Sequence, residues 1–220
     1  MNPFFFIRYG LFKKIKQFAP DLKGSILDFG CGRKPYKNLF TNASRYVGLD
    51  MMGSGHDHTY STVDVYYDGK IIPFPDSSFD HVFSSEVFEH VENLDEILSE
   101  LHRVLKPGGK ILITVPFVWN EHEIPYDFRR FTKYGITSIL KMHQFEMEKL
   151  ETSSHFFETL YQMLILYVFH LFQTNNKMLN ILLTIIFIAP LNLLGIILVN
   201  IVPKNRSLYH NIVLIAKKVE

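Results

Sequence analysis

An aspartate and two glycines, Asp28, Gly30 and Gly32, are the residues of this chain best suited to bind a ligand. They end an apolar run that begins at Ile26, which is typical of a buried strand leading into a tight turn. Glycines permit positive φ and lack the Cβ atoms that keep a ligand away from the backbone. Because open α/β sheets bind ligands at the carboxyl ends of their strands, the pattern predicts a ligand site here. A dinucleotide-binding turn would have a third glycine where this chain has Pro35, so the sequence disfavours NAD.

A second carboxylate, Asp50, ends the apolar segment Tyr46 to Leu49. It lies about 20 positions after the glycines, where a carboxylate can bind both hydroxyls of a ribose. A third apolar stretch, Val63 to Tyr67, ends at Asp68, whose carboxylate we expect to face an adenine edge. Asp64 is the alternative for that role, because the register of this strand is open by several residues. The acids together predict a nucleoside ligand.

The segments that follow predict the elements around this site. A fourth strand, His81 to Ser84, precedes a helix that we expect to start at Asn93, with Glu96 in the pattern of a capping box. Proline and glycine at 107–109 end this helix before a strand over 110–115.

In this order, the segments resemble class I S-adenosylmethionine-dependent methyltransferases of the type 11 group. The resemblance covers residues 20–152 and rests on Leu27–Gly32, Asp50, Pro73–Asp80, Phe88–Val91 and Arg103–Gly109. It implies an α/β fold with a Rossmann-like seven-stranded sheet of order 3-2-1-4-5-7-6, whose last strand is antiparallel. It also implies that the glycine turn holds the methionine end of S-adenosylmethionine, that Asp50 holds the ribose and that Asp68 lies near the adenine. The predicted cofactor-binding residues are Asp28, Gly30, Cys31, Gly32, Asp50, Met51, Asp68 and Ser85.

The loop after the fifth strand, residues 115–132, concentrates titratable and aromatic side chains. Such a loop favours substrate recognition over core packing. If the acceptor is a hydroxyl, a base would help to remove its proton, and the candidates are His122, then Asp127, then His90. The alternative for His90 and its neighbour Glu89 is to satisfy buried backbone groups at a helix start. The predicted substrate-binding residues are Trp119, Tyr126, Arg129 and Arg130. Either arginine could instead pair with the loop aspartate and only tie the loop down.

Composition and length restrict the classes of partner, metal site and domain organisation that the sequence allows. The net charge is +1 and no basic stripe is interleaved with aromatic residues, which disfavours a nucleic-acid substrate. The single cysteine, Cys31, cannot form an internal disulfide and has no partners at zinc spacing, which is typical of a cytoplasmic-facing protein. The adjacent residues His56, Asp57 and His58 suit a polar loop, so no metal site is predicted. A length of 220 residues suits a single domain over 1–220.

Two charge-free stretches occupy the carboxyl-terminal third. Neither 159–176 nor 178–203 contains Asp, Glu, Lys or Arg, and the second is long enough to span a bilayer as a helix. His210 to Lys218 looks like the last strand of the sheet, so the chain must return to the side that it left and a single crossing is excluded. We therefore predict a hydrophobic helical insertion over 159–203, folded as a hairpin about residues 174–177.

We expect this insertion to contact a membrane, with Lys204, Arg206 and Tyr209 at the lipid interface. The alternatives are a helical pair that packs on the domain, or a hydrophobic dimer contact.

The sequence thus predicts methyl transfer from S-adenosylmethionine to a small-molecule or glycan acceptor, in particular a saccharide or lipid-linked saccharide hydroxyl, on the cytoplasmic side of a membrane. One alternative is a quinone, lipid or other apolar acceptor. Another is a catalytically silent scaffold in a membrane-associated complex.

Overall fold

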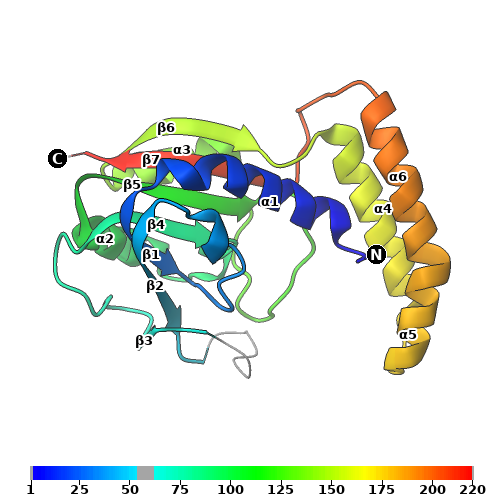
Figure 1. Ribbon diagram of the computed structural model, residues 1–220, viewed down its shortest axis with the longest axis horizontal. Coiled ribbons are helices and arrows are strands. Elements are labelled where there is room, and N and C mark those ends of the chain that lie inside the picture. Colours follow the sequence, from blue (N-terminus) through cyan, green and yellow to red (C-terminus); the bar gives the residue numbers. More distant parts are fainter. Residues whose placement is uncertain (1, 54–61, 220) are drawn as a thin grey trace. The chain divides into compact units, whose positions relative to one another are not determined.

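The computed structural model describes residues 2–53 and 62–219, so the cluster of His56, Asp57 and His58 lies outside the described residues. The chain divides into two units, one formed by Met1–Lys13 with Thr152–Asn211, the other by Lys14–Glu151 with Ile212–Glu220. Helices and strands are labelled in Figure 1. In chain order they are α1 (Phe5–Phe18), β1 (Gly24–Phe29), β2 (Ala43–Met51), β3 (Val65–Tyr67), β4 (Phe79–Ser85), α2 (Leu94–Val104), β5 (Leu105–Pro116), α3 (Lys133–Met142), β6 (Phe145–Thr152), α4 (Phe156–Phe172), α5 (Lys177–Leu183), α6 (Ala189–Ile201) and β7 (Asn211–Lys218).

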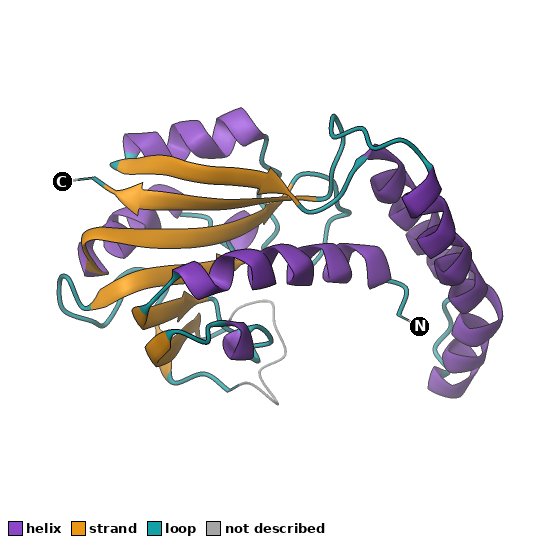
Figure 2. Cartoon of the chain, turned by 45° about the horizontal axis from the view of Figure 1, so that its top comes forward, coloured by secondary structure: helices purple, strands orange, loops and turns teal. Residues whose placement is uncertain are grey.

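The strands form one seven-stranded sheet of order β3-β2-β1-β4-β5-β7-β6, which confirms the predicted topology. The pairs β1–β2, β2–β3, β1–β4 and β4–β5 are parallel. Figure 2 shows β7 running in the direction opposite to its neighbours. Because β1 and β4 lie side by side at the centre and β2 flanks β1, the carboxyl ends of these three strands meet at one edge. This edge is where the sheet reverses its order and where ligands bind in such folds.

The core of the larger unit is built from apolar runs on the central strands. Ile26 and Leu27 on β1 are fully buried, as expected for a parallel strand that is covered on both faces. Helices α2 and α3 lie on one face of the sheet (Figures 1 and 2). On α2 the five apolar residues that recur at helical spacing are all buried, namely Leu94, Ile97, Leu98, Leu101 and Val104. The helix is therefore fixed against the sheet by its apolar stripe.

The predicted capping box at the start of α2 is wrong. Asn93 precedes the helix, but its side chain caps no backbone N–H of α2. Its amide nitrogen donates instead to Gly69 O at 3.2 Å and to Glu96 Oε2 at 2.9 Å. The tertiary contact with Gly69 turns the side chain away from the cap, and it joins the helix start to the loop after β3.

The smaller unit contains the predicted helical hairpin. Its first arm is α4, and its second is one continuous helical run of α5, the π-helix Thr184–Ile188 and α6. Asn176 caps the second arm by accepting from the backbone N–H groups of Met178 and Leu179. Tyr161 donates its hydroxyl to Leu191 O at 2.8 Å, which joins the two arms.

The amino end of α1 is held by the first arm. Gln162 Oε1 accepts from the backbone N–H groups of Phe6 at 3.0 Å and Ile7 at 3.3 Å, and its Nε2 donates to Pro3 O at 2.7 Å. A side chain 156 positions away thus satisfies amides that a helix start leaves free. Phe6 packs with Tyr161 in the small apolar core of this unit.

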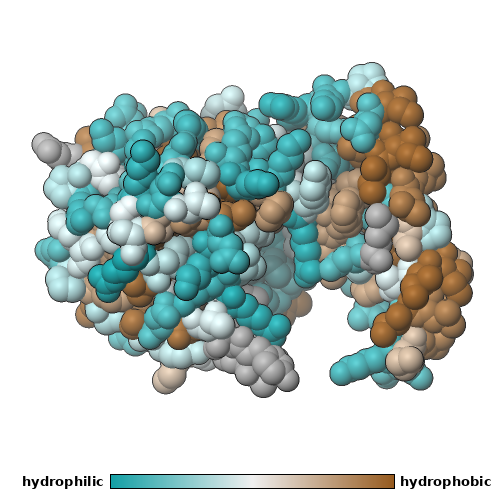
Figure 3. Space-filling view, viewed as in Figure 1, coloured by the Kyte–Doolittle hydropathy of each residue, from teal (hydrophilic) through white to brown (hydrophobic). Residues whose placement is uncertain are grey.

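The outer surface of the hairpin is apolar. The run Lys177–Ile201 is the one helix among the described residues that is long and apolar enough to cross a membrane. Figure 3 shows hydrophobic residues gathered over this run. Its exposed large side chains include Met178, Ile181, Leu182, Ile185, Ile186, Leu193, Leu194, Ile197 and Ile201. Lys204 and Arg206 after it are exposed, but Tyr209 is buried, so the prediction that Tyr209 lies at a lipid interface is wrong.

Candidate functional site

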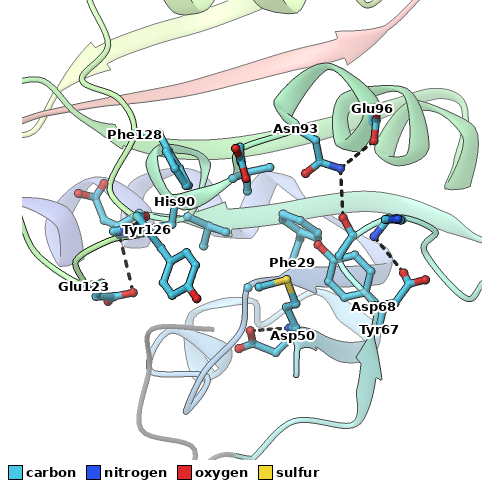
Figure 4. A pocket seen from close by; sticks show the side chains of 18 of the residues that line it. Phe29, Asp50, Tyr67, Asp68, His90, Asn93, Glu96, Glu123, Tyr126 and Phe128 are labelled. Carbon is cyan, nitrogen blue, oxygen red and sulfur yellow. Dashed lines mark hydrogen bonds and ion pairs between the residues drawn. The ribbon is translucent and has the colours of Figure 1, made fainter. Parts of the chain in front are cut away.

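A cavity of about 440 Å³ opens at the carboxyl ends of the central strands, within the larger unit. Figure 4 shows side chains from the two sides of the cavity pointing into it. The end formed by β1, β2 and β3 includes Gly30, Asp50, Met51, Tyr67 and Asp68. The other end includes Glu86, His90, Glu123, Tyr126 and Phe128. The volume of the whole cavity lies within the range of about 300–1,000 Å³ that is usual for cofactor and small-molecule sites.

The glycine turn after β1 is shaped by the close approach of another segment. Gly30 has φ +70°, and a Cβ atom built on it would lie 2.4 Å from Val87 Cγ2. Its backbone N–H donates to Leu49 O at 2.9 Å. Glycine is therefore required here for its φ and for the space that Val87 occupies.

Asp50 connects the turn to the cavity. Its Oδ2 accepts from the backbone N–H of Gly32 at 2.8 Å, and its Oδ1 accepts from that of Met51 at 2.8 Å. Both bonds fix the carboxylate at the end of β2, where it lines the cavity. A carboxylate held in this way is preorganised to accept from the hydroxyls of a ribose.

Asp28 and Cys31 face away from this space. Neither they nor Gly32 are among the described residues that line the cavity. The carboxylate of Asp28 accepts from the Tyr46 hydroxyl at 2.7 Å. Burial raises the pKa of Asp28 to about 7, against the opposing effect of that hydrogen bond. Burial also raises the pKa of the Cys31 thiol, so this cysteine is an inert small residue of the turn.

The two acids considered for the adenine end are separated by the structure. Asp64 accepts from the backbone N–H of Gly48 at 2.6 Å and from Lys34 Nζ at 2.5 Å, which ties it to β2. Asp68 lines the cavity. Its Oδ1 accepts from the backbone N–H groups of Lys70 and Ile71, and the first of these bonds lowers the pKa of Asp68 most.

Ser85 lies on the wall between the two ends. It is the last residue of β4 and lines the cavity. Its hydroxyl lies 2.9 Å from that of Thr114 on β5. Thr114 also donates to Glu86 Oε1 at 2.7 Å and accepts from the Glu86 backbone N–H. These contacts fix the segment after β4, which continues to His90.

At the acceptor end, two histidines from different segments meet. His90 Nε2 and His122 Nε2 are 3.2 Å apart. His90 lies in the short helical turn Phe88–His90 after β4 and lines the cavity. His122 comes from the loop after β5 and is not among the described lining residues. The order of the predicted base candidates therefore changes, because His90 faces the cavity and His122 lies behind it.

The carboxylate of Asp127 accepts hydrogen bonds from residues of its own loop. Its two oxygens accept from Arg130 Nη1 at 2.5 Å and Nη2 at 2.7 Å, and Oδ2 also accepts from the His122 backbone N–H at 2.9 Å. The hydrogen bonds from Arg130 are the main reason that the pKa of Asp127 falls to about 2. Such a carboxylate orients its neighbours and is a poor proton acceptor near neutral pH.

The predicted substrate-binding residues also fall into two groups, those that hold the loop together and those that line the cavity. Arg130 donates to Trp119 O, and Arg129 donates to Val91 O and to Glu92 O, so both guanidinium groups hold backbone. The alternative in which an arginine ties the loop down therefore describes Arg130. Tyr126 lines the cavity.

The cavity residues Glu86, Glu123 and Phe128 are not among the site residues that the sequence predicts. Glu123 could have been found, since it follows His122 in the loop already considered. Glu89 is fully buried, and neither of its carboxylate oxygens has a hydrogen-bond partner among the described residues. Burial raises its pKa well above the usual value. The alternative that Glu89 and His90 satisfy buried backbone groups therefore fails for Glu89, whereas His90 Nδ1 does contact a backbone oxygen, that of Tyr126, at 2.7 Å.

Comparison with known proteins fits this geometry. Residues 27–113 match the family model of the methyltransferase domain. Over these residues the chain is similar to a methyltransferase domain. It is 30% identical over 134 residues to a probable S-adenosylmethionine-dependent methyltransferase of Mycolicibacterium smegmatis, covering 56% of this chain and 52% of that protein. It is 33% identical over 104 residues to a fatty-acid O-methyltransferase of the same species, covering 43% and 38% of the two chains.

Solved structures share the fold. The phosphoethanolamine N-methyltransferase 2 of Haemonchus contortus, solved with S-adenosyl-L-methionine, is similar with a TM-score of 0.58 at 19% identity. The match covers 96% of this chain and 53% of that one. The chain thus spans about half of that structure and less than two thirds of the curated relatives that it matches.

Proposed function

We propose that this chain is an S-adenosylmethionine-dependent methyltransferase that acts on an oxygen of a small-molecule acceptor, in particular a saccharide or lipid-linked saccharide hydroxyl. The observation that carries the proposal is the single cavity that unites the backbone of Gly30, the carboxylate of Asp50 and Ser85 at the ends of three neighbouring strands. The methyltransferase domain match over residues 27–113 supports it.

The residues present fit the cofactor. The carboxylate of Asp50 has its position fixed by two backbone N–H groups and is directed at the cavity, as ribose binding requires. Gly30 lines the same cavity beside it. Asp68 lies farther along the same wall and would take the adenine end. When bound, S-adenosylmethionine supplies a sulfonium methyl group that an acceptor atom can attack in line.

The opposite end of the cavity suits a polar acceptor. His90, Glu123 and Tyr126 line it, and these side chains can hydrogen-bond to a hydroxyl and orient it. Correct orientation by itself can supply much of the rate of such a displacement. An apolar acceptor is the second candidate, because the hairpin exposes a continuous apolar surface and one relative is named a fatty-acid O-methyltransferase.

We further propose that the hairpin contacts a membrane from the cytoplasmic side. The exposed apolar residues of the run Lys177–Ile201 and the exposed basic residues Lys204 and Arg206 support this, because bilayer interfaces favour both. In vesicle flotation, the double variant Ile181→Glu/Ile185→Glu should remain in the aqueous fraction while the wild type floats. The control is Ile71→Glu, which changes an isoleucine outside the hairpin that is at least as exposed. Equal flotation of all three proteins would refute membrane contact.

Calorimetric titration with S-adenosylmethionine, and with NADH as the control ligand, tests the cofactor. We expect binding of the former alone. Transfer of labelled methyl to cell fractions then tests the acceptor: incorporation into delipidated polysaccharide supports a glycan, and incorporation only into extracted lipid supports the apolar candidate. Cofactor binding without transfer to any fraction would favour a silent scaffold and would overturn the proposed activity.

A further inference from the structure

We propose that Glu89, His90 and His122 bind a divalent transition-metal cation of the zinc type at the acceptor end of the cavity. The three residues each offer one ligand atom, and these atoms all lie within 4.8 Å of one another. Two histidines and one carboxylate are a donor set that zinc uses in catalytic sites. The sequence did not suggest this site, because 32 positions separate the two histidines.

The hydrogen bonds of the two imidazoles determine which nitrogens are available. His90 Nδ1 lies 2.7 Å from Tyr126 O, an acceptor, so this nitrogen carries a proton. His122 Nδ1 lies 3.2 Å from Asp127 Oδ2 and 3.3 Å from Asn120 O, which are also acceptors. In the neutral tautomers, both Nε2 atoms then present lone pairs.

Two lone pairs that face each other repel unless a positive charge lies between them. A shared proton or a metal cation can provide that charge. Metal-bound histidines characteristically donate their second ring N–H to a carbonyl or a carboxylate. His90 does the first and His122 the second. The second contacts of the imidazoles are therefore those of metal ligands.

The distances fit a metal ion. Zinc binds imidazole nitrogen at about 2.0–2.1 Å, so two such nitrogens on a tetrahedral ion lie about 3.3 Å apart. The two Nε2 atoms are 3.2 Å apart. Glu89 Oε1 is 3.8 Å from His90 Nε2, so the carboxylate would have to move closer to share an ion with the two histidines.

The buried carboxylate is the second, independent observation. Glu89 has no exposed surface, and no hydrogen bond from a described residue satisfies either oxygen. A shared proton between the histidines would leave this carboxylate unsatisfied, which costs free energy in a buried site. A cation bound to both histidines and to Glu89 accounts for the lone pairs and for the carboxylate together.

The surrounding charges favour a cation. The charges of Glu86 and Asp127 act on Glu89 and raise its pKa, and Arg130, which is paired with Asp127, partly offsets them. Glu123 Oε2 is 4.0 Å from His90 Nε2. His90 is the one of the three proposed ligands that lines the cavity, and three protein ligands leave a further coordination position for the acceptor.

The role of this cation rests on the proposed function. A cation at this position would bind the acceptor hydroxyl and lower its pKa. As the new oxygen–carbon bond forms, the electron pair of the sulfur–carbon bond stays on sulfur and the hydroxyl proton leaves to water. Methyl transfer should then be lost after chelation and restored by Zn²⁺.

Metal binding is tested without the reaction, on the untagged full chain after removal of metal by EDTA. Titration with Co²⁺ should give one equivalent of visible ligand-field absorption, which Zn²⁺ displaces. Glu89→Gln and His122→Ala should weaken Co²⁺ binding at least 100-fold. Asp127→Asn should weaken it about 10- to 100-fold, the usual effect of losing a carboxylate that orients a ligand. The matched control is His143→Ala, which removes another histidine paired with an aspartate in the same unit and should bind Co²⁺ as the wild type does.

Absence of Co²⁺ absorption in the wild type would overturn the site and leave the shared proton as the explanation. Equal affinity of the Glu89, His122 and His143 variants would overturn it as well. Calorimetry with S-adenosylmethionine on the EDTA-treated proteins separates this outcome from failure of the proposed function and reports whether each variant is folded. Imidazole nitrogen NMR of the wild type gives a check without variants, since Zn²⁺ should shift the Nε2 signals of two histidines.

Discussion

Asp28→Asn is expected to make the stability of the larger unit less dependent on pH. Asp28 is 3% exposed, and burial is the main reason that its pKa is raised to about 7 from the usual 3.8 of an aspartate. The folded chain therefore keeps this proton at a pH where the unfolded chain has released it. Because the native state then binds more protons, the free energy of unfolding falls as pH rises from about 4 to about 7 and is level above that.

The magnitude follows from the two pKa values. A shift of about three units corresponds to about 4 kcal/mol over the whole range. Between about pH 5 and pH 8 the same linkage gives about 2.5 kcal/mol. Asparagine keeps the shape of the side chain but does not titrate, so the difference in unfolding free energy between variant and wild type should change by this amount across the interval. Comparing two pH values cancels any constant packing effect of the substitution.

Urea unfolding followed by circular dichroism at several pH values measures the effect. Tyr46→Phe is the companion variant. It removes the hydroxyl whose hydrogen bond to Asp28 opposes the rise in the pKa of that carboxyl. In that variant the decline in stability should continue to higher pH than in the wild type. Parallel pH profiles for the wild type and Asp28→Asn would refute the conclusion that Asp28 is a protonated buried acid.

Two further predictions concern the cofactor end. Asp50→Ala should weaken S-adenosylmethionine binding about 100-fold or more, the effect of losing two hydrogen bonds to a charged group. His122→Ala should leave this binding near normal. Calorimetry measures both variants, and equal losses would contradict this division of roles. Gly30→Ala should destabilise the unit by about 2 kcal/mol or more and impair cofactor binding, since its Cβ would lie 2.4 Å from Val87 Cγ2. Gly53→Ala is its control in thermal unfolding, because Gly53 also has positive φ but a Cβ there meets no atom of the described residues within 4 Å. An equal effect of both substitutions would assign the cost to φ alone.

The parts of the fold that could be predicted are those encoded locally. The apolar run at Ile26 and Leu27 specifies a buried strand, and the glycines that follow specify its turn, so neither depends on distant residues. Asp50, near the end of β2, could be placed for the same reason. Asn93 shows where local reasoning fails: its spacing to Glu96 matches a capping box, but the carbonyl of Gly69 takes its amide.

The acceptor end was predicted only in outline. The sequence predicts that the loop over 115–132 recognises the substrate, but it could not show that His122 would meet His90, because that contact depends on how two loops pack. It also ranked His122 above His90, and only the fold shows that His90 faces the cavity. The pairing of Asp127 with Arg130, three positions apart, was foreseen as an alternative because it is local.

The segment after β4 links the two ends of the cavity. Val87 packs against the Cα of Gly30 at the cofactor turn, while Glu89 and His90, two and three positions later, belong to the cluster at the acceptor end. The backbone N–H of Glu86 is held by Thr114 on β5. One short segment, fixed to the sheet at its start, therefore sets the separation between the glycine turn and the histidines. In a displacement that depends on alignment, this separation is the quantity that the protein must control.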